Sequence, residues 1–513
     1  MELIRIDDLN ISTDKRHLLE IHQLSIQSNQ KIGLIGQNGV GKTTLINAIC
    51  GTLDSQIMIT GEIRRNCKII MVPQILVPDE KSGGEREKIA LEEAFVKLKN
   101  EKNSILVLDE PTSNLDISHQ KWLIKSLKKI KHPLLVISHD RAFLNQIVDT
   151  IWHFRDEKIR IFNGNYNQYS TLLQKEKEKA MQVYNDQKGQ IKKLESIERI
   201  TRQKAVRATK KRKNLSWSEW KLRDSGSVEK RIYRTCKQLN KKIDKKIEML
   251  DKPRISKPIT LKNARSLGLE VDKNSSLLRI APQEIKIFGR KLFTINQEIK
   301  VQNGTKWLIS GKNGCGKSVF LEQVIDNTIQ VWKHPKLKIG YFSQCIVTES
   351  KDNRKVIDDI LKTSIYDNTT TMQLIGDLHL RKVMNNSVAT LSGGETIYYK
   401  LAKILLGKHN LLILDEPTNY LDIDAIQALE NFLIEYPFSV IIVSHDQAFI
   451  KKSKFEIWKI KNKQFLPITE IKKESRNSEL EILEFQLRQK LLNPEIPLSE
   501  INELKDKIQV ISD

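Results

Sequence analysis

The sequence lacks several features of membrane and secreted proteins. No stretch of its 513 residues approaches the roughly 18 to 20 consecutive apolar residues that span a bilayer. The N-terminal stretch MELIRIDDLNISTDKRH carries acids where a secretory signal has its basic and apolar regions. The five cysteines (Cys50, Cys67, Cys236, Cys315 and Cys345) include no CxxC pair, which argues against a zinc site and a disulfide framework. We therefore expect a cytoplasmic protein.

Acidic residues are also scarce relative to basic ones. The chain has 63 Asp and Glu against 86 Lys and Arg, a formal net charge of +23 with histidine neutral. This net positive charge is larger than solubility requires and indicates a polyanionic partner, either nucleic acid or an anionic membrane surface. The apolar fraction of 39% and the charged fraction of 29% are typical of a folded soluble protein, and the length allows two or three cores.

The chain contains two copies of one five-element pattern. The first copy reads GLIGQNGVGKTT, IIMVPQ, KSGGE, ILVLDEPTSNLD and LLVISHD. The second reads WLISGKNGCGKS, IGYFSQ, LSGGE, LLILDEPTNYLD and VIIVSHD. The shared order indicates an internal repeat. The copies differ in one interval, because Gln74 to Lys81 is 7 positions whereas Gln344 to Leu391 is 47.

The first element of each copy has the GxxxxGK[ST] pattern of a phosphate loop. Its glycines let backbone N–H groups surround a phosphate at the start of a helix, while the lysine reaches the outer phosphates and the hydroxyl ligates magnesium. In the first copy these residues are Gly36, Gln37, Asn38, Gly39, Val40, Gly41, Lys42, Thr43 and Thr44. In the second copy they are Gly311, Lys312, Asn313, Gly314, Cys315, Gly316, Lys317 and Ser318.

Each apolar run before Asp-Glu has the pattern of a buried parallel strand. ILVLD and LLILD are short and bounded by polar residues, so their acids should lie at the carboxyl edge of a sheet, where such folds bind ligands. We expect Asp109 and Asp415 to hold magnesium through water. Glu110 and Glu416 are then the candidates for polarising the attacking water.

Taken together, these elements resemble the ATP-binding cassette, whose signature motif is similar to KSGGE and LSGGE. The resemblance implies two cassettes that close head to tail on two ATP molecules, each phosphate loop facing the signature of the other copy. One site would pair Lys42 with the second signature, and the other would pair Lys317 with the first. The signature residues are Ser82, Gly83, Gly84 and Glu85 in the first cassette and Ser392, Gly393, Gly394 and Glu395 in the second.

The resemblance also implies roles for three further pairs of residues. Gln74 and Gln344 would contact magnesium or water, and Asp116 and Asp422 would lie at the contact between cassettes. His139 and His445 would touch the terminal phosphate. Two departures favour unequal sites: Lys81 replaces the usual leucine of the signature, and only the second cassette has an aromatic, Phe288, placed to stack on adenine.

The segment between the copies is predicted to form a helical hairpin. Residues from about 170 to 213 lack proline and contain one glycine, which favours a helix of roughly 65 Å at about 1.5 Å per residue. A second helical run covers about 228 to 250. Between them SWSE has capping-box spacing, so a short turn should begin at Ser216 and place Trp217 and Trp220 on one face.

Much of the excess positive charge lies in this hairpin. Residues 171–250 contain 24 Lys or Arg against 10 Asp or Glu, and residues 199–213 contain eight cations and no acid. These cations would repel one another unless phosphates neutralised them, so we expect RNA binding; a merely solvated hairpin is the alternative. The tryptophans either stack on a base or pack the tip. The expected RNA-binding residues are Arg199, Arg202, Lys204, Arg207, Lys210, Lys211, Arg212, Lys213, Trp217 and Trp220.

Two cassettes joined by a long basic hairpin resemble the ABC-F family, cytosolic ATPases that act on ribosomes. The resemblance implies binding in the tRNA exit site, with the hairpin reaching toward the peptidyl-transferase centre and peptidyl-tRNA. With seven positions after Gln74, the arm common in housekeeping members does not fit. The chain therefore looks most like Vga-type resistance members, which protect bacterial ribosomes from lincosamides, streptogramin A and pleuromutilins. Closure on ATP and Mg²⁺ would set the hairpin, and hydrolysis would release the protein.

We expect an α/β protein with two P-loop cassettes, at residues 1–165 and 256–470, joined by a hairpin at 166–255. A helical C-terminal extension at 471–513 would pack on the second cassette or contact the ribosome. The protein would act as a monomer with an intramolecular cassette dimer and no membrane domain. A housekeeping translation or ribosome-assembly factor and a transporter ATPase subunit are the rival functions.

Overall fold

The structure of the chain is a computed structural model, and it divides into two compact units, 1–166 with 258–513, and 167–257. Within the described backbone, the side chains at 16, 83, 205–212, 225–230 and 420 are left undescribed. The described residues are 2–13, 16–53, 57–74, 83–113, 115–155, 157–212, 225–248, 261, 271–272, 275–343, 353–468 and 483.

The first cassette is built on a mostly parallel sheet of order β5-β6-β7-β3-β8-β9, in which only β9 is antiparallel to its neighbour. Every residue of β6 is buried, as expected for a strand covered on both faces. The strands are β3 (Lys31–Gly36), β5 (Lys68–Val72), β6 (Ser104–Asp109), β7 (Leu134–Ile137), β8 (Thr150–Arg155) and β9 (Lys158–Asn163).

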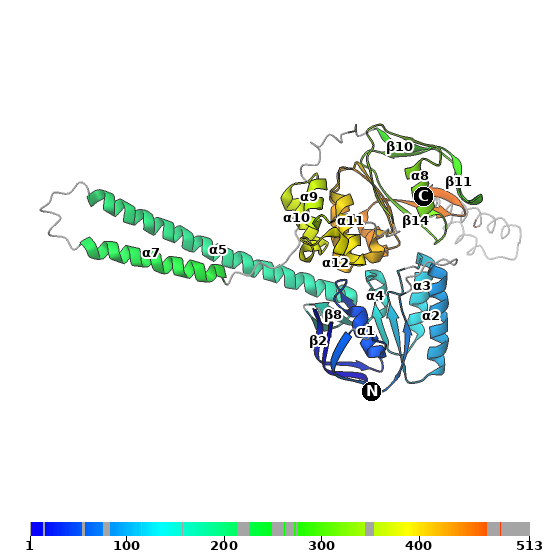
Figure 1. Cartoon of the computed structure of the whole chain (residues 1–513), viewed down its shortest axis with the longest axis horizontal. Coiled ribbons are helices and arrows are strands. Elements are labelled where there is room, and N and C mark those ends of the chain that lie inside the picture. The colour runs from blue at the N-terminus through cyan, green and yellow to red at the C-terminus, as the bar shows by residue number, and fades with distance from the viewer. Residues whose placement is uncertain are drawn as a thin grey trace, which may run out of the picture. The chain divides into compact units, whose positions relative to one another are not determined.

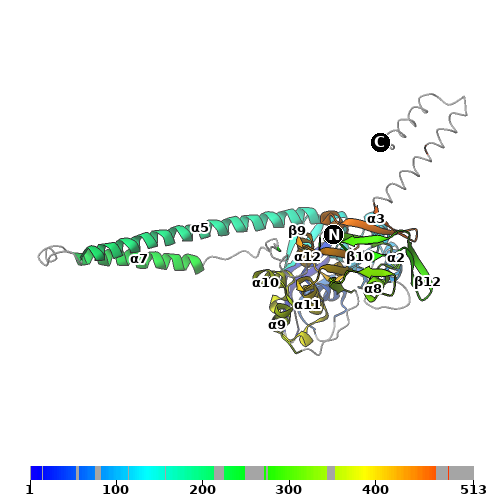
Figure 2. The same ribbon diagram turned by 90° about the horizontal axis from the view of Figure 1, so that it is seen from above.

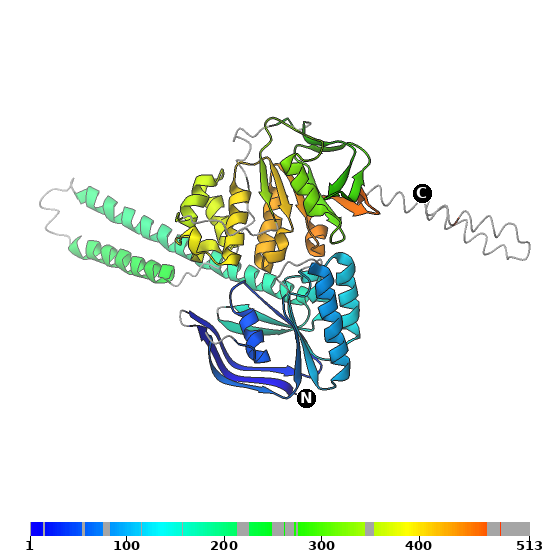
Figure 3. The ribbon, with the colours of Figure 1, turned by 45° about the vertical axis from the view of Figure 1, so that its right-hand side comes forward.

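An antiparallel sheet of order β2-β1-β4 completes the first cassette (Figure 3). Its buried side chains share one hydrophobic core with those of α1 and the parallel sheet. The strands are β1 (Glu2–Thr13), β2 (Arg16–Gln27) and β4 (Ile57–Arg65), and the helices are α1 (Lys42–Cys50), α2 (Gly83–Asn100), α3 (Ile117–Lys129) and α4 (Arg141–Ile147).

The second cassette repeats this topology. Its eight-stranded sheet has the order β11-β12-β20-β19-β14-β18-β17-β16. The last six of these strands, from β20 to β16, are the counterparts of β9, β8, β3, β7, β6 and β5 in the first sheet. A separate antiparallel sheet has the order β13-β10-β15. The strands are β10 (Ser276–Ile280), β11 (Gln283–Ile287), β12 (Arg290–Ile295), β13 (Ile299–Gln302), β14 (Lys306–Gly311), β15 (Val331–Lys333), β16 (Ile339–Phe342), β17 (Leu411–Asp415), β18 (Ser439–Val443), β19 (Glu456–Lys461) and β20 (Gln464–Pro467).

The second cassette has a helical layer between β16 and its signature helix, in the interval that the first cassette shortens. Figure 1 shows these helices beside the sheet, and buried side chains from this layer share a core with α12 and the sheet. The helices of this cassette are α8 (Lys317–Asp326), α9 (Val356–Thr363), α10 (Asn368–Asp377), η2 (Leu380–Lys382), η3 (Val388–Thr390), α11 (Gly393–Leu406), η4 (Pro417–Tyr420), α12 (Ile423–Glu435) and α13 (Gln447–Ser453).

The second unit is a pair of long helices, α5 (Tyr166–Arg212) and α7 (Ser225–Glu248), which confirm the two helices predicted from the sequence. They run side by side in both Figure 1 and Figure 2. Ile191 and Ile243 are buried, and Lys246 Nζ donates a hydrogen bond to Gln190 Oε1 at 2.6 Å. The predicted capped turn at Ser216 lies outside the described residues.

The predicted α/β class with two P-loop domains and a helical insert is confirmed. The predicted C-terminal extension lies outside the described residues except for residue 483. None of the helices in the described part of the chain is long and apolar enough to cross a bilayer.

Candidate functional site

The two phosphate loops have the same internal geometry. Lys42 Nζ donates to the carbonyl oxygens of Gly36 and Gln37, both at 2.8 Å. Lys317 Nζ donates to the carbonyl oxygens of Gly311 and Lys312 at 3.0 and 3.2 Å. Both lysines are buried, and burial lowers the pKa of Lys42. Each loop therefore holds a buried lysine side chain at its centre.

Helices α1 and α8 begin in a way that suits a bound anion. Each starts after a glycine with positive φ, Gly41 at 104° and Gly316 at 101°, and neither has a side-chain cap. By contrast, aspartate side chains cap α3, α4, α12 and α13. The uncapped N–H groups at the start of α1 and α8 can therefore bind phosphate oxygens, and the helix dipole favours the negative charge.

The expected magnesium ligands meet at the ends of the buried strands. Thr43 Oγ1 donates to Asp109 Oδ2 at 3.0 Å, and Ser318 hydrogen-bonds Asp415 in the second cassette. Burial raises the pKa of both aspartates. Asp415 Oδ1 is buried with no hydrogen-bond partner in the described part of the chain. A hydroxyl beside a buried carboxylate fits Mg²⁺, which prefers oxygen ligands.

Glu110 and Glu416 follow these aspartates in a strained conformation. Their φ values are 50° and 47°, in the left-handed region that non-glycine residues seldom adopt and that recurs at functional sites. Burial raises the pKa of Glu110 to about 8 and that of Glu416 to about 7. One carboxylate oxygen of each lacks a hydrogen-bond partner among the described residues. Both glutamates are thus held ready to bind a water or a protonated group.

A histidine lies beside each glutamate. His139 Nε2 is 3.4 Å from Glu110 Oε1, and His445 Nε2 is 3.2 Å from Glu416 Oε1. Burial, followed by the nearby phosphate-loop lysine, lowers the pKa of both histidines to about 3. Both rings are therefore neutral at pH 7, and each can donate or accept a hydrogen bond.

The first phosphate loop contacts the second cassette. Asn38 N donates to Asp422 Oδ2 at 3.2 Å, and Asn38 Nδ2 donates to the Tyr398 hydroxyl at 3.0 Å. The Tyr398 hydroxyl also accepts from Asp422 N at 3.2 Å. Gln37 Nε2 is 3.3 Å from His379 Nδ1. Because Tyr398 lies on α11, these contacts place the first phosphate loop against the helix that carries the second signature.

The second phosphate loop contacts the first cassette through the equivalent aspartate. Asn313 N donates to Asp116 Oδ2 at 3.3 Å, while Asp116 Oδ1 accepts from the backbone N–H groups of Ser118 and His119 and so caps α3. Burial by itself would raise the pKa of Asp116, but hydrogen bonds from the Ser118 hydroxyl and from the His119 and Asn313 N–H groups outweigh it and lower the pKa to about 2. Asp422 has the same double role, because its Oδ1 accepts from Ala425 N at the start of α12.

The signature residues lie at the start of α2 and α11. Ser392 and Glu395 form a capping box, in which Glu395 Oε2 accepts from Ser392 N at 2.9 Å and Glu395 N donates to Ser392 Oγ at 3.4 Å. Gly393 and Gly394 form the first turn of α11. In the first cassette α2 begins with Gly83, Gly84 and Glu85, whereas Ser82 lies outside the described residues.

The remaining predicted residues are only partly described. Gln74 follows β5 and is half-buried, whereas Gln344 lies outside the described residues. Phe288, in the turn between β11 and β12, is fully exposed, with φ of 44°. Arg199, Arg202 and Lys204 are exposed on α5. The four cations Arg207, Lys210, Lys211 and Arg212 are described only as α5 backbone; Lys213, Trp217 and Trp220 lie outside the described residues.

Sequence reasoning missed several residues that join the cassettes. Arg141, after the first SHD motif, pairs with Glu430 of α12 and lies 3.5 Å from Asp446 Oδ2. Tyr398 could have been found, because it lies four positions after Gly394 and hence on the same face of α11. His379 had no signal, since the first copy has no equivalent segment.

Comparison with known proteins agrees with this geometry. A family model described as "ABC transporter" matches residues 19–74 and 295–419, which include both phosphate loops. The erythromycin resistance ATP-binding protein MsrA of Staphylococcus epidermidis is 28% identical over 497 residues, covering 91% of this chain and 99% of that protein. The ribosome protection protein VmlR of Bacillus subtilis strain 168 is 26% identical over 498 residues, covering 88% and 85% respectively.

A solved structure agrees with the fold. The RNase-L inhibitor has a TM-score of 0.55 and 16% identity, over 90% of each chain. At this identity the likeness concerns the fold alone.

Proposed function

The chain is an ATPase with two ATP-binding cassettes that resembles the ABC-F proteins, and from this premise we propose that it binds the bacterial ribosome and protects it from antibiotics. The observation that carries the proposal is the pair of cassettes, each phosphate loop contacting the other cassette, with the basic helices α5 and α7 between them in sequence. The names of MsrA and VmlR support it, since both concern resistance or ribosome protection.

ATP serves in this proposal for switching, and no ribosomal component is modified. Lys42 and Lys317 bind its phosphates, and the phosphate-loop N–H groups neutralise charge that would otherwise hold the cassettes apart. Thr43, Asp109 and Gln74 would hold Mg²⁺ in one site, and Ser318, Asp415 and Gln344 would hold it in the other. A bound Mg²⁺ would supply positive charge that stabilises the phosphates. Glu110 and Glu416 orient the attacking water, and the neutral His139 and His445 hydrogen-bond the terminal phosphate.

The linker is the part that meets RNA in this proposal. Arg199, Arg202 and Lys204 are exposed along α5 and can bind ribosomal phosphates through charge-assisted hydrogen bonds. The protein, cytoplasmic and ribosome-associated, would occupy the tRNA exit site beside peptidyl-tRNA. Its linker would displace drugs of the peptidyl-transferase centre, namely lincosamides, streptogramin A and pleuromutilins.

Drug susceptibility tests this proposal. We expect expression in a susceptible bacterium to raise the inhibitory concentrations of these three drug classes. The double variant Glu110→Gln/Glu416→Gln should not confer this protection, whereas Glu93→Gln/Glu435→Gln, which changes two exposed glutamates, should protect like the unmodified protein. An unchanged susceptibility to all three classes would instead favour a housekeeping translation or ribosome-assembly factor.

A further inference from the structure

The cassettes meet near α4 and α13. This contact has two regions, and the residues of one region are the counterparts of those of the other in the internal repeat. Asp116 and Asp140 cap α3 and α4, and Asp422 and Asp446, each 306 positions later, cap α12 and α13. In one region the side chains form an ion cluster around a buried glutamate. Glu430, with 1% of its side chain exposed, pairs with Arg141 of the other cassette and with Lys452 at 2.8 Å.

In the other region, neutral residues stand at the positions equivalent to Arg141, Glu430 and Lys452. At the same offset, Gln447 stands for Arg141, Ile124 for Glu430, and Gln146 for Lys452. The structure has a cavity of about 380 Å³ here that is open to solvent, and its three lysines are exposed. Its lining residues are Lys121, Ile124, Lys125, Lys128, Gln146 and Gln447.

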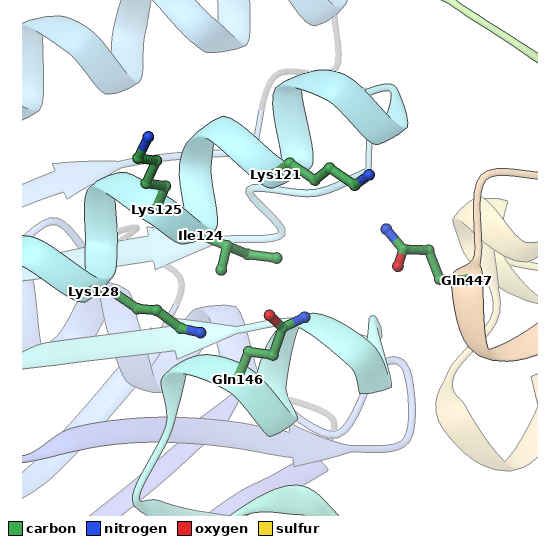
Figure 4. A pocket seen from close by; sticks show the side chains of 6 residues that line it. All are labelled: Lys121, Ile124, Lys125, Lys128, Gln146 and Gln447. Carbon is green, nitrogen blue, oxygen red and sulfur yellow. The ribbon is translucent and has the colours of Figure 1, made fainter. Parts of the chain in front are cut away.

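The cavity collects positive charge. In Figure 4 Lys121 extends toward Gln447, Lys128 extends toward Gln146, Ile124 lies between them, and Lys125 points away from the centre. Among the described residues none of the three lysines forms an ion pair with a carboxylate, and no acid lines the cavity. The second cassette has no cation at the equivalent positions, which are Gln427, Asn431 and Ile434.

These lysines repel one another along α3. Lys121 and Lys125 are four positions apart and Lys125 and Lys128 three apart, the spacings at which like charges destabilise a helix. The amide of Gln447 adds N–H donors, and the amide of Gln146, which donates to the Ala142 carbonyl at 3.2 Å, has a second N–H. A group that binds here should therefore be an anion with several acceptor oxygens, and phosphate has both the charge and the oxygens.

We propose that this cavity, defined here as the lysine pocket, binds a phosphate group and so supplies between the cassettes the negative charge that Glu430 supplies on the other side. The source that the proposed function favours is the backbone of ribosomal RNA, so this assignment rests on that function. A free phosphate or pyrophosphate has the same chemistry and is the other source.

Two variants of the full-length protein test the lysine pocket. Lys121→Gln/Lys125→Gln/Lys128→Gln removes its charge. Ile124→Glu/Gln447→Arg introduces the ion pair found on the other side. The matched control is Lys97→Gln/Lys99→Gln/Lys102→Gln, which removes the same charge from exposed lysines of the first cassette. Thermal unfolding of each variant with ATP and Mg²⁺ checks that it is folded.

The first measurement is the affinity of each variant for purified ribosomes in the presence of a non-hydrolysable ATP analogue, over a series of salt concentrations. For RNA phosphates we expect both pocket variants to bind roughly 10- to 100-fold more weakly than the control at 0.1 M salt. The slope of log affinity against log salt should fall by about 2 for the triple variant. Absence of ribosome binding by the unmodified protein would contradict the proposed function and leave the second measurement to decide the pocket.

The second measurement is titration with inorganic pyrophosphate while the analogue saturates both ATP sites. Saturable binding by the unmodified protein and the control, lost in both pocket variants, would support a free phosphate source. The lysine pocket would be ruled out as a phosphate site if both pocket variants matched the control in both measurements.

Discussion

At the scale of single residues, Asp422 makes three different interactions. It caps α12, accepts from Asn38 of the first phosphate loop and lies 3.3 Å from His379 Nε2. Asp422→Ala should lower the free energy of unfolding by about 1 kcal/mol through loss of the cap alone. Asp422→Asn keeps a good capping residue and should be closer to the unmodified protein. Urea unfolding compares the two, and equal losses would contradict the capping role.

His379 gives the contact between cassettes a dependence on pH. Burial would lower its pKa, but the Asp422 carboxylate, 3.3 Å from Nε2, together with Asp424 and Asp377 outweighs burial and raises it. A group whose pKa rises on folding stabilises the folded protein while it is protonated. This stabilisation is fully present at pH values below the pKa in the unfolded chain, near 6.5, and is lost as pH rises through the higher pKa in the folded protein. Tyr398 and Gln37 also face this ring but carry no charge.

We therefore expect His379→Gln to destabilise the protein more at pH 6 than at pH 8.5. Thermal unfolding of both proteins at the two pH values measures the difference. A loss that is the same at both would show that the charge of His379 contributes nothing, and that its ring acts only through packing.

At the scale of elements, Arg141 and Glu430 join α4 of the first cassette to α12 of the second. Removing one partner of a buried ion pair leaves a charge unpaired and typically costs 3 to 5 kcal/mol. Because Lys452 and Asp446 remain nearby, Glu430→Ile should lower the free energy of unfolding by an amount at the lower end of this range, about 3 kcal/mol.

The double variant Arg141→Gln/Glu430→Ile reproduces the pair found at Gln447 and Ile124. We expect it to be more stable than the sum of the two single changes predicts, because neither Arg141 nor Glu430 remains without the other. A double-mutant cycle by chemical unfolding measures the coupling. Strict additivity would mean that the two side chains do not interact in solution.

The sequence predicted the elements that carry motifs, because their chemistry is local. A phosphate loop needs glycine, lysine and a hydroxyl within eight positions, and a buried parallel strand needs a short apolar run. Contacts between cassettes that lie outside the motifs could not be predicted in the same way. Arg141 and Glu430 are 289 positions apart, and neither belongs to a motif, so only the docking of α4 and α12 reveals the pair.

At the scale of the whole molecule, the repeated topology predicts two equivalent ATP sites, yet the residues around them differ. Tyr398 on α11 contacts the first phosphate loop, whereas its counterpart on α2, Lys88, lies over the ring of Trp122 within its own cassette. The sequence suggested unequal sites from Lys81 and Phe288. The structure adds Tyr398 and His379, which contact the first phosphate loop, and the Arg141–Glu430 pair, which has no counterpart at Gln447 and Ile124.

We propose that ATP holds the closed cassettes on the ribosome and that hydrolysis releases them. The direct test is co-sedimentation of Glu110→Gln/Glu416→Gln with ribosomes in ATP and Mg²⁺, followed by dilution to measure release. We expect the variant to remain bound with unhydrolysed ATP, while the unmodified protein and Glu93→Gln/Glu435→Gln dissociate. Release of the variant at the rate of the unmodified protein would contradict the account.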